Sequence, residues 1–129
     1  MSRITRQNLT FMITMLIMLA GCDEVIFEED ITNSYLKILA PTNESNVDAG
    51  NIIFTWEAVE YADQYHIQIA TPDFDHANQI ILDSIITNTN CNKVLFSGNY
   101  EWRVRAQNSV YVTSYFSNDF HVIERSATP

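Results

Sequence analysis

The chain has 129 residues and is acidic, with 7 Lys and Arg against 16 Asp and Glu and a formal net charge of −9. This length favours one domain over two. The charge argues against nucleic-acid binding, which needs clustered Lys and Arg against phosphates, and against adsorption to anionic lipid through a basic face. We therefore expect no nucleic-acid partner.

The first 21 residues combine a basic start with a short apolar run. Arg3 and Arg6 precede residues 9–20, which are apolar except for Thr10 and Thr14. As a helix this run would span about 18 Å, short of the roughly 30 Å hydrocarbon core of a membrane. Residues 1–21 are therefore predicted to be a cleaved signal peptide rather than a membrane span or a short buried helix. Its removal takes away two of the 7 basic residues and no acid, which leaves 5 against 16 and a net charge of −11.

The apolar run ends in Leu19-Ala20-Gly21-Cys22. These four residues resemble the bacterial lipobox, in which small residues precede a cysteine that receives diacylglycerol before cleavage. The resemblance implies lipidation of the Cys22 sulfur, a mature N-terminus at Cys22 and the membrane as a partner. Buried acyl chains stabilise such attachment by about 0.8 kcal/mol per CH₂.

Residues 22–34 are predicted to be an acidic tether. Asp23 and Glu24 follow the cysteine directly, and Glu28-Glu29-Asp30 come shortly after. The cluster resembles the surface-export signal of Bacteroidetes lipoproteins, which implies an outer-membrane lipoprotein facing the cell surface. Two alternatives stay open: Asp23 resembles an inner-membrane retention signal of enteric bacteria, and the acids could simply solvate a spacer.

After Ser34, short β-rich runs alternate with turn residues at roughly ten-residue spacing, as in β-sandwiches and barrels. The seven predicted strands are residues 35–39, 52–57, 64–70, 79–86, 93–96, 99–108 and 115–123. Residues 42–50 are polar and are predicted to form a loop, and residues 125–129 a tail.

One face of each strand is expected to supply the core, because alternate strand residues point to the same side of a sheet. The large aromatic residues at these positions are Trp56, Tyr65, Tyr100 and Trp102. The pattern predicts an all-β fold, a single seven-stranded antiparallel β-sandwich over residues 35–124.

The order of several segments resembles fibronectin type III domains of bacterial surface lipoproteins, over about residues 36–123. The segments are Leu39-Ala40-Pro41, Phe54-Thr55-Trp56-Glu57-Ala58, residues 62–70, residues 95–108, Tyr115-Phe116-Ser117 and Phe120-His121-Val122. The resemblance implies that Trp56 is a core residue and that Tyr100 forms a tyrosine corner, its hydroxyl bonding to nearby backbone. The cell-attachment tripeptide of some animal members is absent, so integrin-type adhesion is not implied, and fold alone does not define function.

The sequence offers little for catalysis or metal binding. His66, His76 and His121 stand at no ligand spacing from one another, and Asp73 and Asp75 are too few for a calcium loop. Cys91 is the one thiol left once Cys22 is lipidated, and no nucleophile motif surrounds it. We expect no enzyme activity, no metal and no cofactor.

Aromatic residues near the last loop suggest a binding surface. Tyr111, Tyr115 and Phe116 cluster there, and exposed aromatic rings can anchor proteins or stack on sugars. Ordinary strand alternation, which would bury Tyr115 or Phe116, is the alternative. Arg103 and Arg105 point outward and are expected to pair with charges across strands. The predicted function is a non-enzymatic protein-interaction module. The alternative is a glycan-binding accessory lipoprotein of a polysaccharide-uptake system, with Tyr111 and Tyr115 as the stacking surface.

Overall fold

The computed structural model describes residue 21 and residues 27–125. The predicted leader up to residue 20, the lipidation site Cys22 and most of the tail lie outside the described residues. The strands are β1 (Ile38–Ala40), β2 (Ser45–Asp48), β3 (Gly50–Trp56), β4 (Gln64–Thr71), β5 (Gln79–Ile86), β6 (Asn90–Leu95), β7 (Gly98–Gln107) and β8 (Phe116–Ile123). No helix in this described part is long and apolar enough to cross a membrane.

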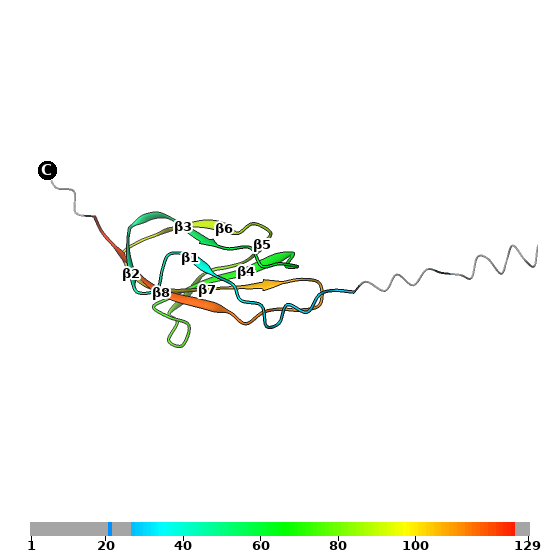
Figure 1. Cartoon of the computed structure of the whole chain (residues 1–129). Coiled ribbons are helices and arrows are strands. Elements are labelled where there is room, and N and C mark those ends of the chain that lie inside the picture. The colour runs from blue at the N-terminus through cyan, green and yellow to red at the C-terminus, as the bar shows by residue number, and fades with distance from the viewer. Residues whose placement is uncertain (1–20, 22–26, 126–129) are drawn as a thin grey trace, which may run out of the picture.

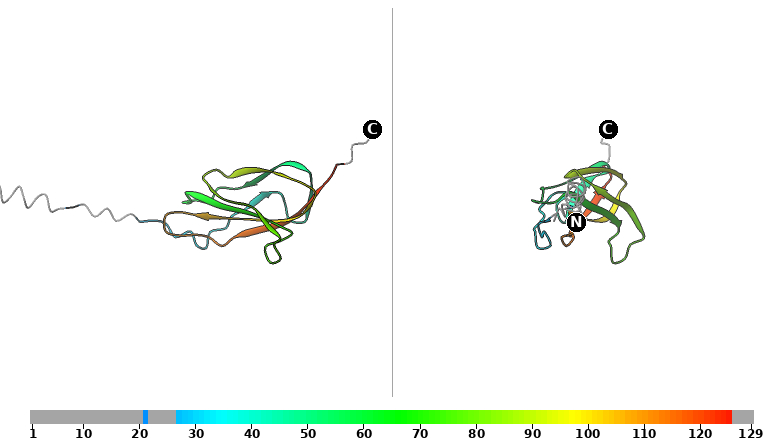
Figure 2. Two further views of the ribbon diagram at one scale, coloured as in Figure 1. Left: turned by 180° about the vertical axis from the view of Figure 1, so that it is seen from behind. Right: turned by 90° about the vertical axis from the view of Figure 1, so that its right-hand side faces the viewer.

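The strands form two sheets that pack face to face, so the predicted all-β sandwich is confirmed (Figure 1). One sheet has three strands in the order β1-β3-β6, and the other has five in the order β2-β8-β7-β4-β5. The first described residues and the C-terminal end of β8 lie at opposite ends of the sandwich, as the two views of Figure 2 also show. The longest strand, β7, lies in the middle of the larger sheet, between β8 and β4.

The predicted strand count was wrong by one, because residues 42–50 are not only a loop. They contain β2, which pairs with β8 from Ser45↔Phe120 to Asp48↔Ile123. This pairing is parallel, whereas the prediction was an antiparallel sandwich. β2 is an edge strand with a single aliphatic residue, Val47, so backbone hydrogen bonds hold it and the hydrophobic pattern gives no sign of it.

The core lies between the sheets and is rich in aromatic rings. Trp56, Tyr65, Tyr100 and Trp102 are all buried. The Trp102 ring meets Phe54 edge-on, with ring centroids 5.0 Å apart, and the Trp56 ring meets Tyr65 at 5.6 Å. Edge-to-face pairs of this kind add roughly 0.5–1.5 kcal/mol each beyond the area they bury. The strands therefore alternate between a buried and a solvent-facing side, as the period of two indicated.

The Tyr100 hydroxyl donates a hydrogen bond to the Phe96 carbonyl over 2.8 Å, four residues back along the chain. This is the tyrosine corner that the family resemblance implied. Burial raises the pKa of Tyr100, because an ionised phenolate would be poorly solvated there. The bond fixes the turn between β6 and β7.

The segment predicted as a tether contributes to the folded domain. Ile31, which is 1% exposed, and Leu36 both belong to the hydrophobic core. Glu28 accepts a hydrogen bond from the Ser109 hydroxyl over 2.5 Å, and the Glu29 carbonyl accepts one from the Asn108 side chain over 2.9 Å. The folded unit therefore extends before residue 35, because an isoleucine in an acidic stretch fills a gap at one end of the sandwich.

Candidate functional site

The three aromatic residues predicted as a binding surface make different contacts. Tyr111 and Phe116 are half-buried and pack against the core. The Phe116 ring also meets the exposed Tyr35 ring edge-on, with centroids 5.2 Å apart. Tyr115 instead contacts the polar side chains of His66, Arg103 and Arg105 on the outer face of the five-stranded sheet.

Outward-facing residues of three strands meet on this face. In the register of the sheet, Gln68 of β4 lies opposite Asp83 of β5 and Arg103 of β7, and His66 lies opposite Arg105. Alternate residues of one strand share a face, and residues paired across strands have Cβ atoms about 4.5–5.5 Å apart. The sheet therefore brings these five side chains together, although they are distant in sequence.

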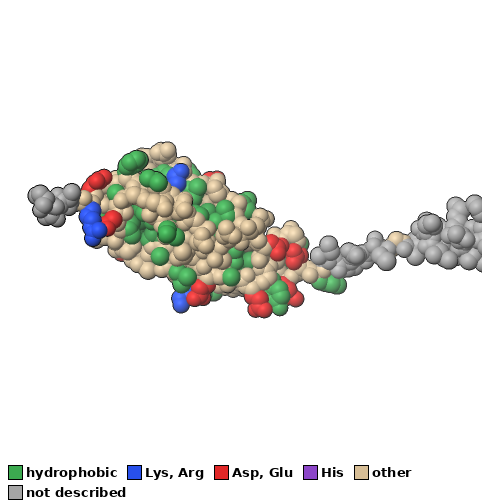
Figure 3. All heavy atoms as spheres, turned by 90° about the horizontal axis from the view of Figure 1, so that it is seen from above, with side chains coloured by type: hydrophobic (Ala, Val, Ile, Leu, Met, Phe, Trp, Pro, Cys, Tyr) green, Lys and Arg blue, Asp and Glu red, His purple; other side chains and the backbone are tan. Residues whose placement is uncertain are grey.

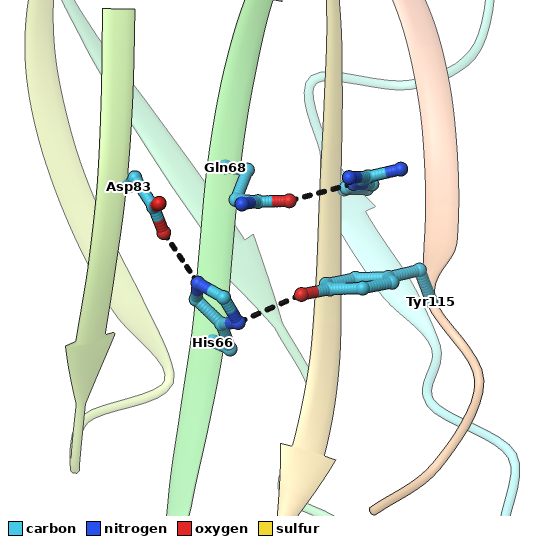
Figure 4. Close-up of polar contacts among 5 residues, drawn as sticks. His66, Gln68, Asp83 and Tyr115 are labelled. Carbon is cyan, nitrogen blue, oxygen red and sulfur yellow. Dashed lines mark hydrogen bonds and ion pairs between the residues drawn. The ribbon is translucent and has the colours of Figure 1, made fainter. Parts of the chain in front are cut away.

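His66 connects Asp83 to Tyr115 (Figure 4). Asp83 reaches from β5 to Nε2 of the ring, and the Tyr115 hydroxyl lies 2.7 Å from Nδ1. Since an ionised carboxylate only accepts, His66 Nε2–H donates to Asp83, and in the neutral ring Nδ1 accepts from the Tyr115 hydroxyl. The hydrogen bond from His66 is the main reason that the pKa of Asp83 lies below its usual value, with a smaller contribution from the charge of Arg103.

Two arginines pack against aromatic rings beside this chain of hydrogen bonds. The Arg103 Cζ lies 3.9 Å from the Phe74 ring centroid and 4.4 Å from that of Tyr115, and the Arg105 Cζ lies 4.7 Å from the Tyr115 centroid. Arg103 Nε also donates to the Gln68 side chain over 2.8 Å, the bond drawn beside His66 in Figure 4. We call Phe74, Arg103, Tyr115 and Arg105 the arginine–aromatic cluster; such cation–π contacts contribute about 0.5–2 kcal/mol each.

The loop after β4 supplies Phe74 to the cluster. The Phe74 backbone N–H donates to the Glu101 carboxylate over 2.8 Å, which ties this loop to β7. Nearby, the Asp73 carboxylate accepts from the His76 backbone N–H over 2.7 Å, and this bond is the largest cause of the lowered pKa of Asp73. Asp73 therefore shapes its own turn, which is the local role that Asp side chains commonly have in loops.

The expected cross-strand ion pairs of Arg103 and Arg105 are not observed. Neither arginine forms an ion pair with a carboxylate within the part of the chain that the structure describes. Arg105 Nε is shielded from solvent and has no hydrogen-bond partner. Glu101, on the same strand, is bound to the Phe74 backbone instead. The two positive charges of the cluster thus form no direct ion pair among the described residues, and Asp83 is close enough to Arg103 only for a small electrostatic effect.

The remaining candidate residues have structural surroundings. Cys91 is a free, half-buried thiol, and burial raises its pKa, which favours the unreactive protonated form. Among residues 27–125, no three His, Cys, Asp or Glu side chains are arranged to hold a metal ion. The arginine–aromatic cluster is therefore the arrangement with the clearest capacity to bind a ligand: it offers fixed, planar hydrogen-bond donors with positive charge.

The sequence does not show that the members of this cluster lie together. His66 was considered only as a metal ligand, and Phe74 and Gln68 received no role. One signal was present in the sequence: His66 and Gln68 are two residues apart on one strand, and Arg103 and Arg105 are two residues apart on another. This spacing puts each pair on one face of the sheet. Which strands are neighbours depends on long-range pairing, so the contact itself could not be predicted.

Comparison with known proteins supports the fold. No model of a known protein family matches the sequence, and no curated protein matches it. The fibronectin(III)-like modules of Clostridium thermocellum CbhA are 18% identical, with a TM-score of 0.50, and the match covers 70% of this chain and 98% of theirs. The fibronectin type III domain derived from human KIAA0970 protein is 14% identical, with a TM-score of 0.53 and 80% of each chain covered. The domain is therefore a fibronectin type III-like β-sandwich, as the sequence resemblance implied.

Proposed function

We propose that this chain is a non-enzymatic protein-interaction module, anchored to a bacterial membrane through lipid on Cys22. The observation that supports binding most directly is the arginine–aromatic cluster, in which Arg103 and Arg105 are held in place but lack carboxylate partners. The fibronectin type III-like fold is consistent with this role, but a fold alone does not define function, so the cluster carries the proposal.

The anchoring is supported by the sequence Leu19-Ala20-Gly21-Cys22 after an apolar run. The acids that follow Cys22 favour an outer-membrane lipoprotein that faces the cell surface, as in Bacteroidetes. A net charge of −11 after cleavage suits a soluble domain on a crowded surface.

Anchoring and orientation are tested together on intact cells that express the full chain. Mass spectrometry of the mature N-terminus should find diacylglycerol on Cys22, and added protease should digest the domain. A Cys22→Ser variant should lose the lipid and leave the membrane fraction. An unmodified leader would overturn the anchor, and a lipidated but protected domain would overturn the surface location.

Binding is tested by photocrosslinking in the same cells. The crosslinker p-benzoylphenylalanine replaces Ser117, which is exposed and lies opposite Arg103 in the register of β7 and β8. The matched control replaces Ile53, an exposed residue of β3 in the other sheet. A protein adduct at position 117 and none at position 53 supports the proposal. No adduct at position 117 contradicts it.

Glycan binding is a second candidate, in an accessory lipoprotein of a polysaccharide-uptake system. The observation that favours it is Tyr35, 74% exposed beside Phe116 at a groove of about 250 Å³ that also contains Ser117 and Asn118. An exposed ring beside hydroxyl and amide groups suits a sugar. Tyr111 and Tyr115, the residues first expected to stack on sugar, already pack against the core and against the two arginines. Binding on a glycan array that disappears with Tyr35→Ala would support this candidate, and unchanged binding would refute it.

A further inference from the structure

The positive charges of the domain are unevenly distributed. The described residues contain five basic side chains, and two of them are paired: Lys37 with Glu57 and Arg125 with Asp48. Lys93 stands alone on β6, in the three-stranded sheet. Arg103 and Arg105 are thus the one place, among these residues, where two unpaired positive charges lie on the same face of one strand.

The opposite sheet has a different surface. The view in Figure 3 looks onto the three-stranded sheet, where hydrophobic side chains are scattered and acidic groups gather at the end at which the chain enters the domain. Ile53 and Val94 are among the exposed apolar residues of this sheet. A ligand that seeks paired positive charge is therefore directed to the five-stranded sheet.

The surrounding rings hold the two guanidinium groups ready for a ligand. A guanidinium that packs face-on against an aromatic ring keeps its N–H groups at the edge, where they can meet a carboxylate in the same plane. Arg103 uses Nε for Gln68, which leaves its two terminal nitrogens for such a contact. Tyr115 is itself fixed by His66, so little conformational entropy remains to be lost when a ligand binds.

The spacing of the two arginines selects the form of the ligand. Residues i and i+2 of a strand are about 6.8 Å apart and point to the same side. An extended peptide has the same repeat, so acids at alternate positions would meet Arg103 and Arg105 in turn. Glu101, two residues before Arg103 on β7, pairs with Asp119 of β8 across the sheet. These two carboxylates would repel further acids of the ligand, which limits the site to the part of β7 near Tyr115.

From this arrangement we infer that the arginine–aromatic cluster binds an acidic segment of a partner protein, in extended form, with carboxylates at alternate positions. The inference rests on the proposed protein-interaction function and adds the chemistry of the partner. The carboxylates pair with the terminal nitrogens of Arg103 and Arg105, and the backbone of the segment runs along β7.

The test uses the full chain in detergent micelles and a fluorescent peptide that alternates Thr and Glu, with a Thr–Gln peptide as its control. Anisotropy should show that the Glu peptide binds and that the Gln peptide binds at least about tenfold more weakly, because the neutral amide loses the charge-assisted hydrogen bonds to the guanidinium groups. Raised salt should weaken the binding of the Glu peptide and leave the binding of the Gln peptide unchanged.

Two double variants separate the site from overall charge. Arg103→Gln with Arg105→Gln should lower affinity for the Glu peptide about tenfold or more, whereas Lys37→Gln with Arg125→Gln, equal in charge change, should alter it less than about twofold. Arg103→Lys with Arg105→Lys keeps the charge but loses the planar fork, so binding should weaken to an intermediate level. Near-ultraviolet circular dichroism confirms that each variant is folded.

Equal binding of the two peptides, or equal loss in the two Gln variants, would overturn the inference. Binding of a uronic-acid oligosaccharide in place of the peptide would overturn it as well. In both cases, a protein adduct at position 117 in cells would still support the proposed protein-interaction function. Conversely, binding of the Glu peptide without any adduct in cells would contradict the proposed function but not the peptide-binding site.

Discussion

Replacing Trp56 with alanine is the strictest test of the core. The side chain is 2% exposed, and its ring packs against Tyr65 and Trp102, with centroids 5.6 and 6.2 Å away. Trp56 Nε1 is buried without a hydrogen-bond partner, so the substitution breaks no hydrogen bond and its cost comes from lost packing and the cavity. Removal of a buried Trp costs about 3–5 kcal/mol. Because domains are stable by only about 5–15 kcal/mol, the variant should be close to unfolding.

Urea titration of the full chain, followed by tryptophan fluorescence and by far-ultraviolet circular dichroism, gives the difference in unfolding free energy. Trp102 remains as the fluorophore in the Trp56→Ala variant. The control is Phe96→Ala, at an aromatic ring that is 75% exposed, where a loss of no more than about 0.5 kcal/mol is expected. A loss below about 1 kcal/mol for Trp56→Ala would refute its place in the core.

Three further predictions address the tether, the corner and the outer face. Ile31→Ala should lower the unfolding free energy by about 2–5 kcal/mol in the same titration, because Ile31 is buried, whereas a residue of a solvated tether would show almost no loss. Tyr100→Phe should cost about 0.5–1.5 kcal/mol through the lost bond to Phe96. Burial raises the pKa of Tyr100 in the folded state. The contribution of the hydroxyl to the unfolding free energy is therefore full below the ordinary pKa of about 10 and is lost as the pH rises through the higher folded pKa. Wild type should thus lose stability more steeply in alkali than the Phe variant. The pKa of Asp83 is lowered, mainly by the hydrogen bond with His66. Its contribution to the unfolding free energy is therefore full above the ordinary pKa of about 3.9 and is lost as the pH falls through the lower folded pKa. Asp83→Asn should flatten this acid dependence of stability, and identical acid profiles of the variant and wild type would refute the assignment.

Strands that the sequence predicted well share a strict alternation over many residues. β3, β4 and β7 alternate buried and outward positions along most of their length, with aromatic or branched residues on the buried side. β2 has no such pattern, and its pairing partner lies more than 70 residues away in the chain. An edge strand needs only backbone bonds along one side, so hydrophobic period carries no information about it. Ile31 was not predicted as a core residue for a similar reason: a single apolar residue next to a run of acids shows no hydrophobic period.

The candidate site was predictable in its parts and not as a whole. Outward placement of Arg103 and Arg105 follows from the period of two, and an aromatic residue near the last loop was expected to matter. The partners of Tyr115 depend on the β4–β7 register and on the path of the loop that carries Phe74. Neither the register nor the path leaves a local signal, because both are set by the packing of segments distant in sequence.

The position of the chain entry links the site to the proposed anchor. Glu28 and Glu29 are bound to Ser109 and Asn108, in the loop that leads from β7 toward Tyr115. The tether therefore reaches the domain at the end of β7 that is nearer to Arg105 and Tyr115, whereas Phe74 comes from the loop at the other end of the paired strand β4. Five residues lie between Cys22 and Glu28, so the two are joined by at most about 20 Å of extended chain. A lipid on Cys22 would therefore keep this end of the sandwich close to the bilayer, with the C-terminal end of β8 pointing away from it. If the chain is anchored in this way, a partner that is itself held at the membrane would be favoured over one that approaches from solution, because confinement to one surface raises the effective concentration of the two sites.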